Sequence, residues 1–337
     1  MPLSLGLSIT LFFLTALLTW GWIKIAQTKK IHDTPERRRL HQTQIPRAGG
    51  ISIALVMIAV STFFFLTSDP GSYWPLVCSA IILYSVLGFW DDLKPLRSKT
   101  KLLLHVLTAV IIFLIAIFFL SSSLMTSITI AIAYLLFVNI WNFMDGSNGL
   151  VAMQSLIVVI GFIVLSNFSV CTYYFALALA VCCLGFLPFN FPVARVFLGD
   201  VGSHVLGAAV MSLAVLAYDE RQWKLLEILC LTSAMWIDAG LTFIRRGFRG
   251  FKVTQAHRSH LYQYAIRIGN SHAVVCWYYA AWTLAMIAII GFSRQWPDSH
   301  QQILLLALIT IACALHQSLR LFVLKSRQSP KIPKSLF

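Results

Sequence analysis

Four groups of polar side chains carry the chemistry that this sequence could perform, and the first is an acidic pair. Asp91 and Asp92 are adjacent, and two lysines, Lys94 and Lys101, follow them. Adjacent carboxylates repel each other, so the pair favours a divalent cation or a proton held between them. The lysines supply positive charge for phosphate oxygens. The simpler alternative is a charged loop that joins two helices.

The second group combines amides and a carboxylate at a spacing that a helix would bring together. Asn139, Asn142 and Asp145 recur at every third position, so on a helix they form one polar stripe. The glycines that follow allow a tight turn and the close approach of a ligand to the backbone. The alternative is an ordinary helix end, after which Asn148 caps the next helix.

The third and fourth groups lie further along the chain. Asp200, in the run FLGDVGSH that begins at Phe197, is expected at the start of a helix. There it acts either as an N-cap or as an oxygen ligand for magnesium. His257, Arg258 and His260 suit a pyrophosphate or a sugar phosphate. Two histidines without a nearby cysteine are weak evidence for zinc, and a solvated basic loop is the alternative.

The composition shows which elements must position these groups. The chain has 337 residues, of which 58% are hydrophobic and 11% charged, whereas soluble domains average about 25% charged residues. This excludes an ordinary soluble enzyme, and a nucleic-acid-binding protein as well, despite the formal net charge of +14. A bilayer-spanning helix needs roughly 20 apolar residues.

Uninterrupted apolar segments predict an all-α, polytopic membrane protein with about eleven transmembrane helices and one domain over residues 1–337. The first segment is expected to be a retained helix and not a signal peptide. The predicted spans are 3–23, 49–67, 74–90, 102–121, 124–141, 150–167, 171–188, 202–218, 224–244, 273–292 and 301–323.

The basic residues predict the orientation of these spans. Of the 26 lysines and arginines, all but Arg221, Lys224 and Arg294 fall in one alternate set of loops. The positive-inside rule places that set in the cytoplasm and the N-terminus outside. The polar groups described above lie on the same side, so a catalytic cleft is expected at the cytoplasmic face. A membrane transporter is the competing function, but only Asp238 and His105 are expected deeper in the membrane.

In this order, the four groups resemble the polyprenyl-phosphate N-acetylhexosamine-1-phosphate transferases, also called glycosyltransferase family 4. The resemblance covers nearly the whole chain, from the Asp33 loop with its PRAGG run (46–50) to the histidine loop. It implies a bundle of eleven helices in the bacterial inner membrane. It also implies transfer of a sugar 1-phosphate from a UDP-N-acetylhexosamine to undecaprenyl phosphate, which gives a lipid-linked pyrophosphoryl sugar and UMP.

The resemblance also implies a role for each matching residue. Magnesium, or manganese in its place, would be the cofactor, and one of the acidic pair takes a proton or forms a covalent intermediate. The UDP-sugar, undecaprenyl phosphate and membrane lipid are the implied partners, and a homodimer is left open. The implied residues are Asp91, Asp92 and Asp200 as catalytic groups, Asp200 and Asn142 as metal ligands, and Lys94, Lys101, Asn142, Asp145, Asn148, Phe197, His257, Arg258 and His260 as substrate-binding groups.

Two departures from the family pattern bear on specificity. Asn148 stands where many members carry an aspartate implied to hold the uracil ring, although an amide can also pair with the uracil edge. The histidine loop lacks the three consecutive histidines of the peptidoglycan-precursor enzymes. It is more similar to enzymes that start O-antigen or related polysaccharides. The sugar itself, GlcNAc, FucNAc, QuiNAc or another N-acetylhexosamine, stays open.

Overall fold

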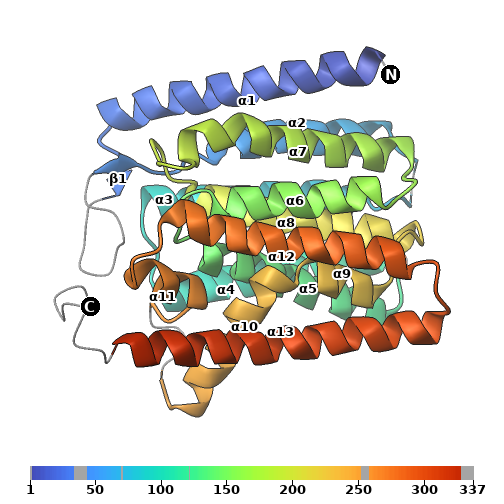
Figure 1. The fold of residues 1–337 in the computed structure, drawn as a ribbon. Helices are drawn as coiled ribbons and strands as arrows, with labels where there is room; N and C mark the ends of the chain where they lie inside the picture. The colour runs from blue at the N-terminus through green and yellow to red at the C-terminus, as the bar shows by residue number, and fades with distance from the viewer. Residues whose placement is uncertain (1, 34–43, 70, 121, 252–257, 328–337) are drawn as a thin grey trace.

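The computed structural model describes residues 2–33, 44–69, 71–120, 122–251 and 258–327, which are nearly all helical (Figure 1). Along the chain the elements are α1 (Pro2–Thr28), β1 (His32–Asp33), β2 (Ile45–Pro46), α2 (Ile51–Thr67), α3 (Trp74–Leu93), α4 (Ser98–Phe119), α5 (Leu124–Met144), α6 (Leu150–Val164), α7 (Val170–Asn190), α8 (Gly199–Asp219), α9 (Leu225–Leu231), α10 (Ser233–Phe248), α11 (Leu261–Arg267), α12 (His272–Ser293) and α13 (Asp298–Arg327). The two short strands pair antiparallel. The expected all-α class is confirmed.

The helices account for all the predicted spans, although not all at full length. Eight helices (α1, α3, α4, α5, α7, α8, α12 and α13) are long and apolar enough to cross a membrane. The pair α9 and α10 makes a ninth span if it is counted as one. Helices α2 and α6 are apolar but have only 17 and 15 residues. The prediction of a multi-pass membrane protein is therefore confirmed, with two short helices and one bent pair among the eleven predicted spans.

The bent pair corrects the prediction of a single helix over 224–244. Helices α9 and α10 meet at Thr232 with a bend of 83°. The Thr232 hydroxyl donates to the Ile228 carbonyl, and the Ser233 hydroxyl to the Cys230 carbonyl. The Trp236 indole donates to the Leu229 carbonyl. Side chains thus satisfy carbonyls near the break, as a helix interrupted in an apolar environment requires.

Helix α8 forms the centre of the bundle, and the other long helices surround it (Figure 1). It packs mainly against α3 and α5, and nearly all of its residues are buried. Helices α1 and α13 lie at opposite edges (Figure 1). Because consecutive long helices run in opposite directions, the ends of α3, α5 and α7 meet the beginnings of α4, α6 and α8. We call this end of the bundle, which also carries β1 and β2, the site end.

Glycines let three helices approach each other closely at the site end. A Cβ atom on Gly88 of α3 would lie 2.5 Å from the Asp200 carbonyl oxygen of α8. A Cβ on Gly50, which precedes α2, would lie 2.2 Å from the Cα atom of Gly202. Real Cβ atoms do not tolerate such distances to a backbone, so these contacts require glycine. They fix the distance between the end of α3 and the start of α8.

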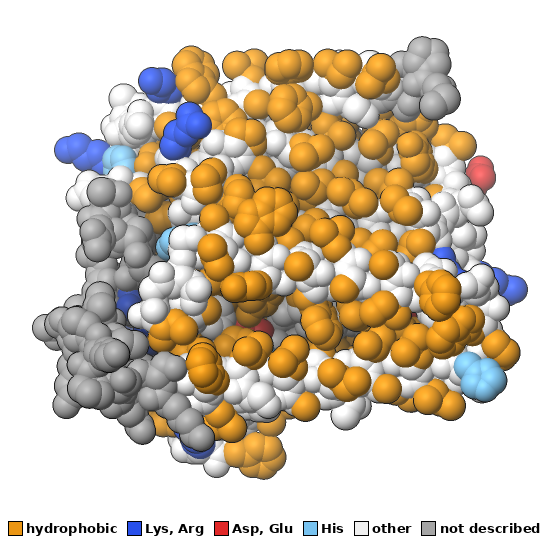
Figure 2. Space-filling view, in the orientation of Figure 1, with side chains coloured by type: hydrophobic (Ala, Val, Ile, Leu, Met, Phe, Trp, Pro, Cys, Tyr) orange, Lys and Arg blue, Asp and Glu red, His pale blue; other side chains and the backbone are white. Residues whose placement is uncertain are grey.

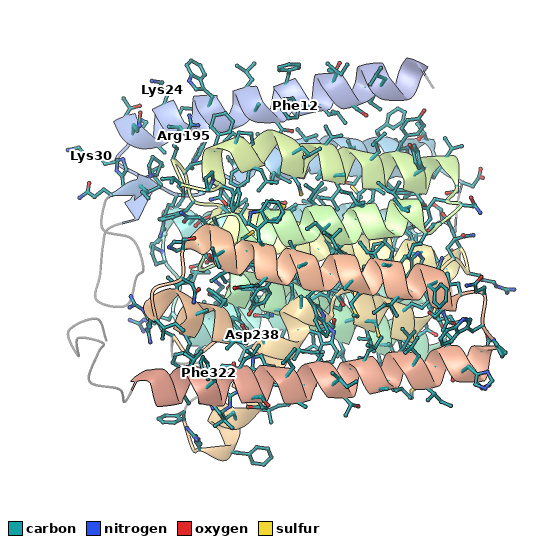
Figure 3. The ribbon with its side chains drawn as sticks, in the orientation of Figure 1. Phe12, Lys24, Lys30, Arg195, Asp238 and Phe322 are labelled. Carbon is teal, nitrogen blue, oxygen red and sulfur yellow. The ribbon has the colours of Figure 1, made fainter. Side chains whose placement is uncertain are left out.

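Surface chemistry separates the two ends from the sides of the bundle. On the face shown in Figure 2, hydrophobic side chains cover the length of the bundle, and the visible lysines and arginines lie towards its ends. Lys24, Lys30 and Arg195 all lie at the site end (Figure 3). This is the surface of a protein whose sides contact lipid and whose ends contact water.

Candidate active site

The acidic pair ends α3, and its two carboxylates face different partners. Asp91 accepts a hydrogen bond from the Leu96 amide at 2.6 Å, and its other oxygen lies 2.8 Å from the Lys101 ammonium. Arg47 donates to the Asp91 carbonyl. Both carboxylates are buried, with Asp91 7% and Asp92 5% exposed. Asp91 therefore faces Lys101, and Asp92 has a different partner.

The Asp92 carboxylate contacts the backbone of α8. Its Oδ2 accepts a hydrogen bond from the Val201 amide at 2.9 Å, in the first turn of that helix. The first turn has unpaired N–H groups and a partial positive charge, so a carboxylate there acts as an N-cap. Gly199 has φ +77°, and a Cβ on it would lie 2.6 Å from the same Asp92 oxygen. Asp92 thus ties the end of α3 to the start of α8.

Three oxygen atoms surround the ammonium group of Lys101. Its Nζ lies 2.6 Å from Asp200 Oδ2, 2.8 Å from Asp91 Oδ2 and 3.4 Å from Asn142 Oδ1. The Asn142 amide donates to Asp200 Oδ1 at 2.6 Å and to Ser203 Oγ at 3.0 Å, so its own oxygen is turned towards Lys101. Four helices, α3, α4, α5 and α8, each supply one of these groups. We call the oxygens of Asp91, Asn142 and Asp200 the oxygen cage.

The turn between α5 and α6 lies beside the cage. Asp145 follows α5 and is half-buried. Burial, together with the negative charges of Asp200 and Asp92, raises the pKa of Asp145 well above its ordinary value. Gly149 has φ +73°, which confirms the expected tight turn. Asn148 precedes Gly149 and donates from its side chain to the Pro192 carbonyl at 3.3 Å. It therefore does not act as a helix cap.

Phe197 lies in a segment that the backbone holds on both sides. Its amide donates to the Pro46 carbonyl at 2.8 Å, and its carbonyl accepts from the Gly49 amide at 2.9 Å. The ring is half-buried and stands three residues before Asp200. The β2 segment and the loop before α8 therefore form one rigid rim of the site.

The histidine loop is anchored by Asp238, which is buried in α10 (Figure 3). Asp238 accepts hydrogen bonds from the Leu261 amide at 2.8 Å and the Tyr279 hydroxyl at 2.6 Å. His316 of α13 lies 3.1 Å from it, and His260 lies 3.8 Å from it. One carboxylate thus joins α10, α11, α12 and α13.

The anchored loop reaches the site through aromatic contacts with α5. The His260 ring stacks on Phe143, with ring centroids 6.5 Å apart. The hydroxyl of Tyr262 donates to the Phe143 carbonyl, and a Cβ on Gly146 would lie 2.2 Å from that hydroxyl. Phe143 is the neighbour of Asn142. The histidine loop is therefore brought against the end of α5 that carries the cage.

Comparison with known proteins shows which family the chain resembles. The family described as Glycosyl transferase family 4 matches residues 74–218, which run from α3 through α8. The phospho-N-acetylmuramoyl-pentapeptide-transferase of Streptococcus pyogenes serotype M12 (strain MGAS2096) is 30% identical over 264 residues, 68% of this chain and 76% of the relative. The chain belongs to glycosyl transferase family 4.

Other relatives of this family extend the similarity. The phospho-N-acetylmuramoyl-pentapeptide-transferase of Carboxydothermus hydrogenoformans (strain ATCC BAA-161 / DSM 6008 / Z-2901) is 28% identical over 306 residues, 80% of this chain and 90% of the relative. The probable undecaprenyl-phosphate N-acetylglucosaminyl 1-phosphate transferase of Bacillus subtilis (strain 168) is 27% identical over 275 residues, 77% of this chain and 74% of the relative. The chain is thus a membrane transferase of the class that passes a phospho-sugar to a polyprenyl phosphate.

The donor atoms of this glycosyl transferase family 4 site fit a small divalent cation. Mg²⁺ prefers carboxylate and amide oxygens and keeps positions for water and phosphate. The oxygen cage offers three such oxygens around one point, which the Lys101 ammonium occupies as a positively charged stand-in. In the described part of the chain, no three His, Cys, Asp or Glu side chains converge as a metal site. A cation here would therefore need Asn142 and further oxygens from water or substrate.

Some predicted residues do not belong to the group formed by Lys101 and the oxygen cage. Lys94 is exposed at the end of α3. Asn139 donates to the Leu135 carbonyl of its own helix, so the expected polar stripe reduces to Asn142 and Asp145. Arg258 is half-buried at the start of the histidine loop. His257 lies outside the described residues.

Two residues at the site had no role in the sequence-based prediction. Arg47 donates to the Asp91 carbonyl, and Asp238 anchors the histidine loop. A lone carboxylate in an apolar segment is costly unless it has partners. That cost was the signal that could have identified Asp238 as an anchor.

Proposed function

We propose that this protein transfers a sugar 1-phosphate from a UDP-N-acetylhexosamine to undecaprenyl phosphate, with Mg²⁺ as cofactor. The products are undecaprenyl-pyrophosphoryl-sugar and UMP. The observation that carries the proposal is the oxygen cage around Lys101, at the helix ends of a membrane bundle. The names of the Streptococcus pyogenes and Bacillus subtilis relatives describe phospho-sugar transfer and support the same reaction.

The arrangement of charges suits phosphoryl transfer. This reaction depends on neutralising phosphate oxygens and on holding the attacking and leaving oxygens in line. Asp200, Asn142 and Asp91 would hold the cation, which supplies positive charge to the diphosphate of the donor. In the complex with both the cation and the substrate, Lys101 would contact a phosphate oxygen. The acceptor phosphate is mostly ionised near neutral pH, so positioning contributes more than proton removal.

The two members of the acidic pair take different parts in this proposal. Asp92 is occupied by the first turn of α8 and positions that helix. Asp91 faces the cage, so it is the member that would meet the acceptor phosphate or the cation. Both the direct displacement and the covalent aspartyl-phosphate route use a carboxylate in this position.

The nucleotide and the sugar are proposed from the rim of the site. Phe197 would stack on the uracil ring, and Asn148 would pair with its edge. The arginine and histidines of the loop at 257–260 would contact the sugar phosphate. Because that loop lacks three consecutive histidines, we place the reaction at the first membrane step of O-antigen or related cell-envelope polysaccharide synthesis.

The site end would face the cytoplasm of a bacterium, where UDP-sugars are made, and the N-terminus would lie outside. The excess of basic residues at this end supports that orientation. The alternative of a membrane transporter has less support. Its candidate residue at depth, Asp238, is fully engaged as an anchor, and the relatives are transferases.

One assay tests the proposed reaction. Purified protein in detergent is given undecaprenyl phosphate and, in turn, radiolabelled UDP-GlcNAc, UDP-FucNAc, UDP-QuiNAc and UDP-MurNAc-pentapeptide, with Mg²⁺ or with EDTA. We expect a labelled lipid and UMP from one of the first three donors, only with Mg²⁺. Asp200→Asn should abolish the product. Asp219→Asn, a change at the opposite, exposed end of the same helix, should keep it.

The outcomes separate the parts of the proposal. Exclusive use of UDP-MurNAc-pentapeptide would refute the O-antigen assignment and keep the reaction class. Full activity of Asp200→Asn, or activity that survives EDTA, would refute the metal assignment. No labelled lipid from any UDP-sugar would refute the donor.

A further inference from the structure

A second polar layer lies one helical turn below the oxygen cage. His105 follows Lys101 by four residues on α4, and His204 follows Asp200 by four residues on α8. Residues four apart lie one above the other on a helix. Since Lys101 and Asp200 touch, their successors should also meet. The ring centroids of His105 and His204 are 4.8 Å apart, with an angle of 88° between the planes.

Helix α3, which carries Asp91 of the cage, supplies the third member of this layer. Tyr84 precedes Asp91 by seven residues on α3, which is two helical turns on the same face. Its ring lies 5.8 Å from that of His105 and 6.5 Å from that of His204, centroid to centroid. We call Tyr84, His105 and His204 the imidazole layer. Helices α3 and α8 therefore contribute to both layers, and α4 supplies Lys101 above and His105 below.

The imidazole layer is buried and has few hydrogen-bond partners among the described residues. All three side chains are 0% exposed. Within the described residues, no hydrogen bond reaches the Tyr84 hydroxyl or either ring nitrogen of His105. The His204 ring interacts with the backbone of Tyr84 and has no side-chain partner among them. Buried polar atoms are nearly always paired, because leaving them unpaired costs stability. Apolar side chains would make this level of the bundle more stable, so the polar atoms call for a functional explanation.

The groups that face this layer limit what it could contact. The positive charge of Lys101 acts on both histidine rings. The negative charge of Asp200 also acts on them, in the opposite direction. Among the described carboxylates, none makes a hydrogen bond with a ring nitrogen of either histidine. Neutral imidazole offers one acceptor nitrogen and one donor nitrogen. The cationic group that acts on both rings is the ammonium of Lys101, which lies at the end of a flexible side chain.

We propose that, in the absence of substrate, His105 and His204 receive the Lys101 ammonium when a divalent cation enters the oxygen cage. The cage cannot hold both positive groups, because the ammonium already uses all three of its oxygens. A displaced ammonium must find another acceptor, since a buried unpaired charge is strongly unfavourable. The imidazole rings one turn below, at the next positions of the same faces of α4 and α8, offer acceptor nitrogens. The histidines are thus positioning residues that act through Lys101.

This proposal rests on the metal assignment of the proposed function, and Mn²⁺ binding tests it without any substrate. Mn²⁺ affinity is measured by electron paramagnetic resonance on purified protein, with Asp200→Asn to define background. Four proteins form a cycle: wild type, His105→Leu, Lys101→Met and the double variant. Loss of a hydrogen bond to a charged group corresponds to about tenfold or more in affinity.

We expect His105→Leu to weaken Mn²⁺ binding about tenfold in the wild-type background. In the Lys101→Met background we expect less than about twofold, because no ammonium then needs an acceptor. His105→Gln should stay close to wild type, since an amide can also accept. His204→Leu is run in the same cycle, so the test stands if one leucine variant fails to fold.

Thermal stability separates this role from packing. The leucine variants remove unpaired polar atoms and should melt at the wild-type temperature or above. The matched control is Tyr134→Phe, deeper in the bundle, where the hydroxyl is paired with Ser212 at 2.7 Å. This control should lower the melting temperature and leave Mn²⁺ affinity unchanged.

Three results would overturn the proposal: unchanged Mn²⁺ affinity in both leucine variants, equal losses with and without Lys101, or no Mn²⁺ binding that depends on Asp200. A wild-type protein that shows the coupling but transfers no sugar phosphate would refute only the proposed reaction. A protein that is active but shows no coupling would refute only the role of the imidazole layer.

Discussion

Replacing Lys101 by methionine should make the oxygen cage bind a divalent cation more tightly. The ammonium lies 2.6 Å from Asp200 Oδ2 and 2.8 Å from Asp91 Oδ2. A cation that enters the cage must displace it. Methionine keeps most of the apolar stem but carries no charge, so the competing cation is removed and the two carboxylates stay.

The contacts set the size of the effect. A hydrogen bond to a charged group contributes about 1.5–3 kcal/mol, and Lys101 makes two with carboxylates. The displaced ammonium regains part of this from other acceptors, so we take one bond as the net cost of displacement. At 1.4 kcal/mol for each factor of ten, Lys101→Met should raise the affinity about 10- to 100-fold. Turnover should fall by about 100-fold or more, as when a preorganised electrostatic contact is lost.

The assay is a titration with Mn²⁺, followed by electron paramagnetic resonance of the free ion and by competition with Mg²⁺. The matched control is Lys99→Met, which removes the same charge from an exposed position two residues earlier on α4. Asp200→Asn gives the background from lipid and detergent. If Lys101→Met binds Mn²⁺ no better than Lys99→Met, the ammonium does not compete for the cage and our assignment of the cage is wrong.

Three further predictions concern the acids, the nucleotide and the topology. Asp91→Asn should lower kcat more than Asp92→Asn, because an amide oxygen at position 92 still accepts from the Val201 amide; equal losses would contradict the division of roles. Asp92→Ala should lower the free energy of unfolding by about 0.5–2 kcal/mol, as for a lost N-cap, which chemical denaturation can measure. Phe197→Ala should raise the KM for the UDP-sugar about 5- to 150-fold, from a stacking contribution of about 1–3 kcal/mol. Asn148→Ala should also raise this KM, but in the variant with both changes it should add less than it does alone. Simple additivity of the two effects would place the uridine elsewhere. A reporter fused after Arg249 should be cytoplasmic, and one after Tyr218 or Arg294 external; the opposite result would place the site on the side without UDP-sugars.

The sequence could predict those features that depend on composition and on local spacing. Long apolar runs fix the helices, since the bilayer leaves few other ways to satisfy the backbone. Asp91, Lys101, Asn142 and Asp200 each stand near a helix end on the same side, so their meeting in one cage followed from the alternation of spans.

Other features depend on contacts between distant segments, and these were not predictable. Asp92 was grouped with Asp91 as a catalytic carboxylate, yet its hydrogen bond goes to Val201, 109 residues away. The bend at Thr232 depends on side chains that satisfy carbonyls near the break. The imidazole layer appears only when α3, α4 and α8 are set at their observed register.

The glycine contact between α3 and α8 has a consequence for how such a site can diverge. Gly88 brings the α3 backbone against the Asp200 carbonyl, with no side chain between them that could adjust. The separation of Asp91 from Asp200 is therefore set by two backbones in contact and does not depend on the loops. Loops that determine specificity for the sugar or the nucleotide can therefore change in length or sequence without moving the carboxylates of Asp91 and Asp200. A single methyl group at position 88, outside every loop, would push α3 away from the start of α8 and so shift Asp91 relative to Asp200.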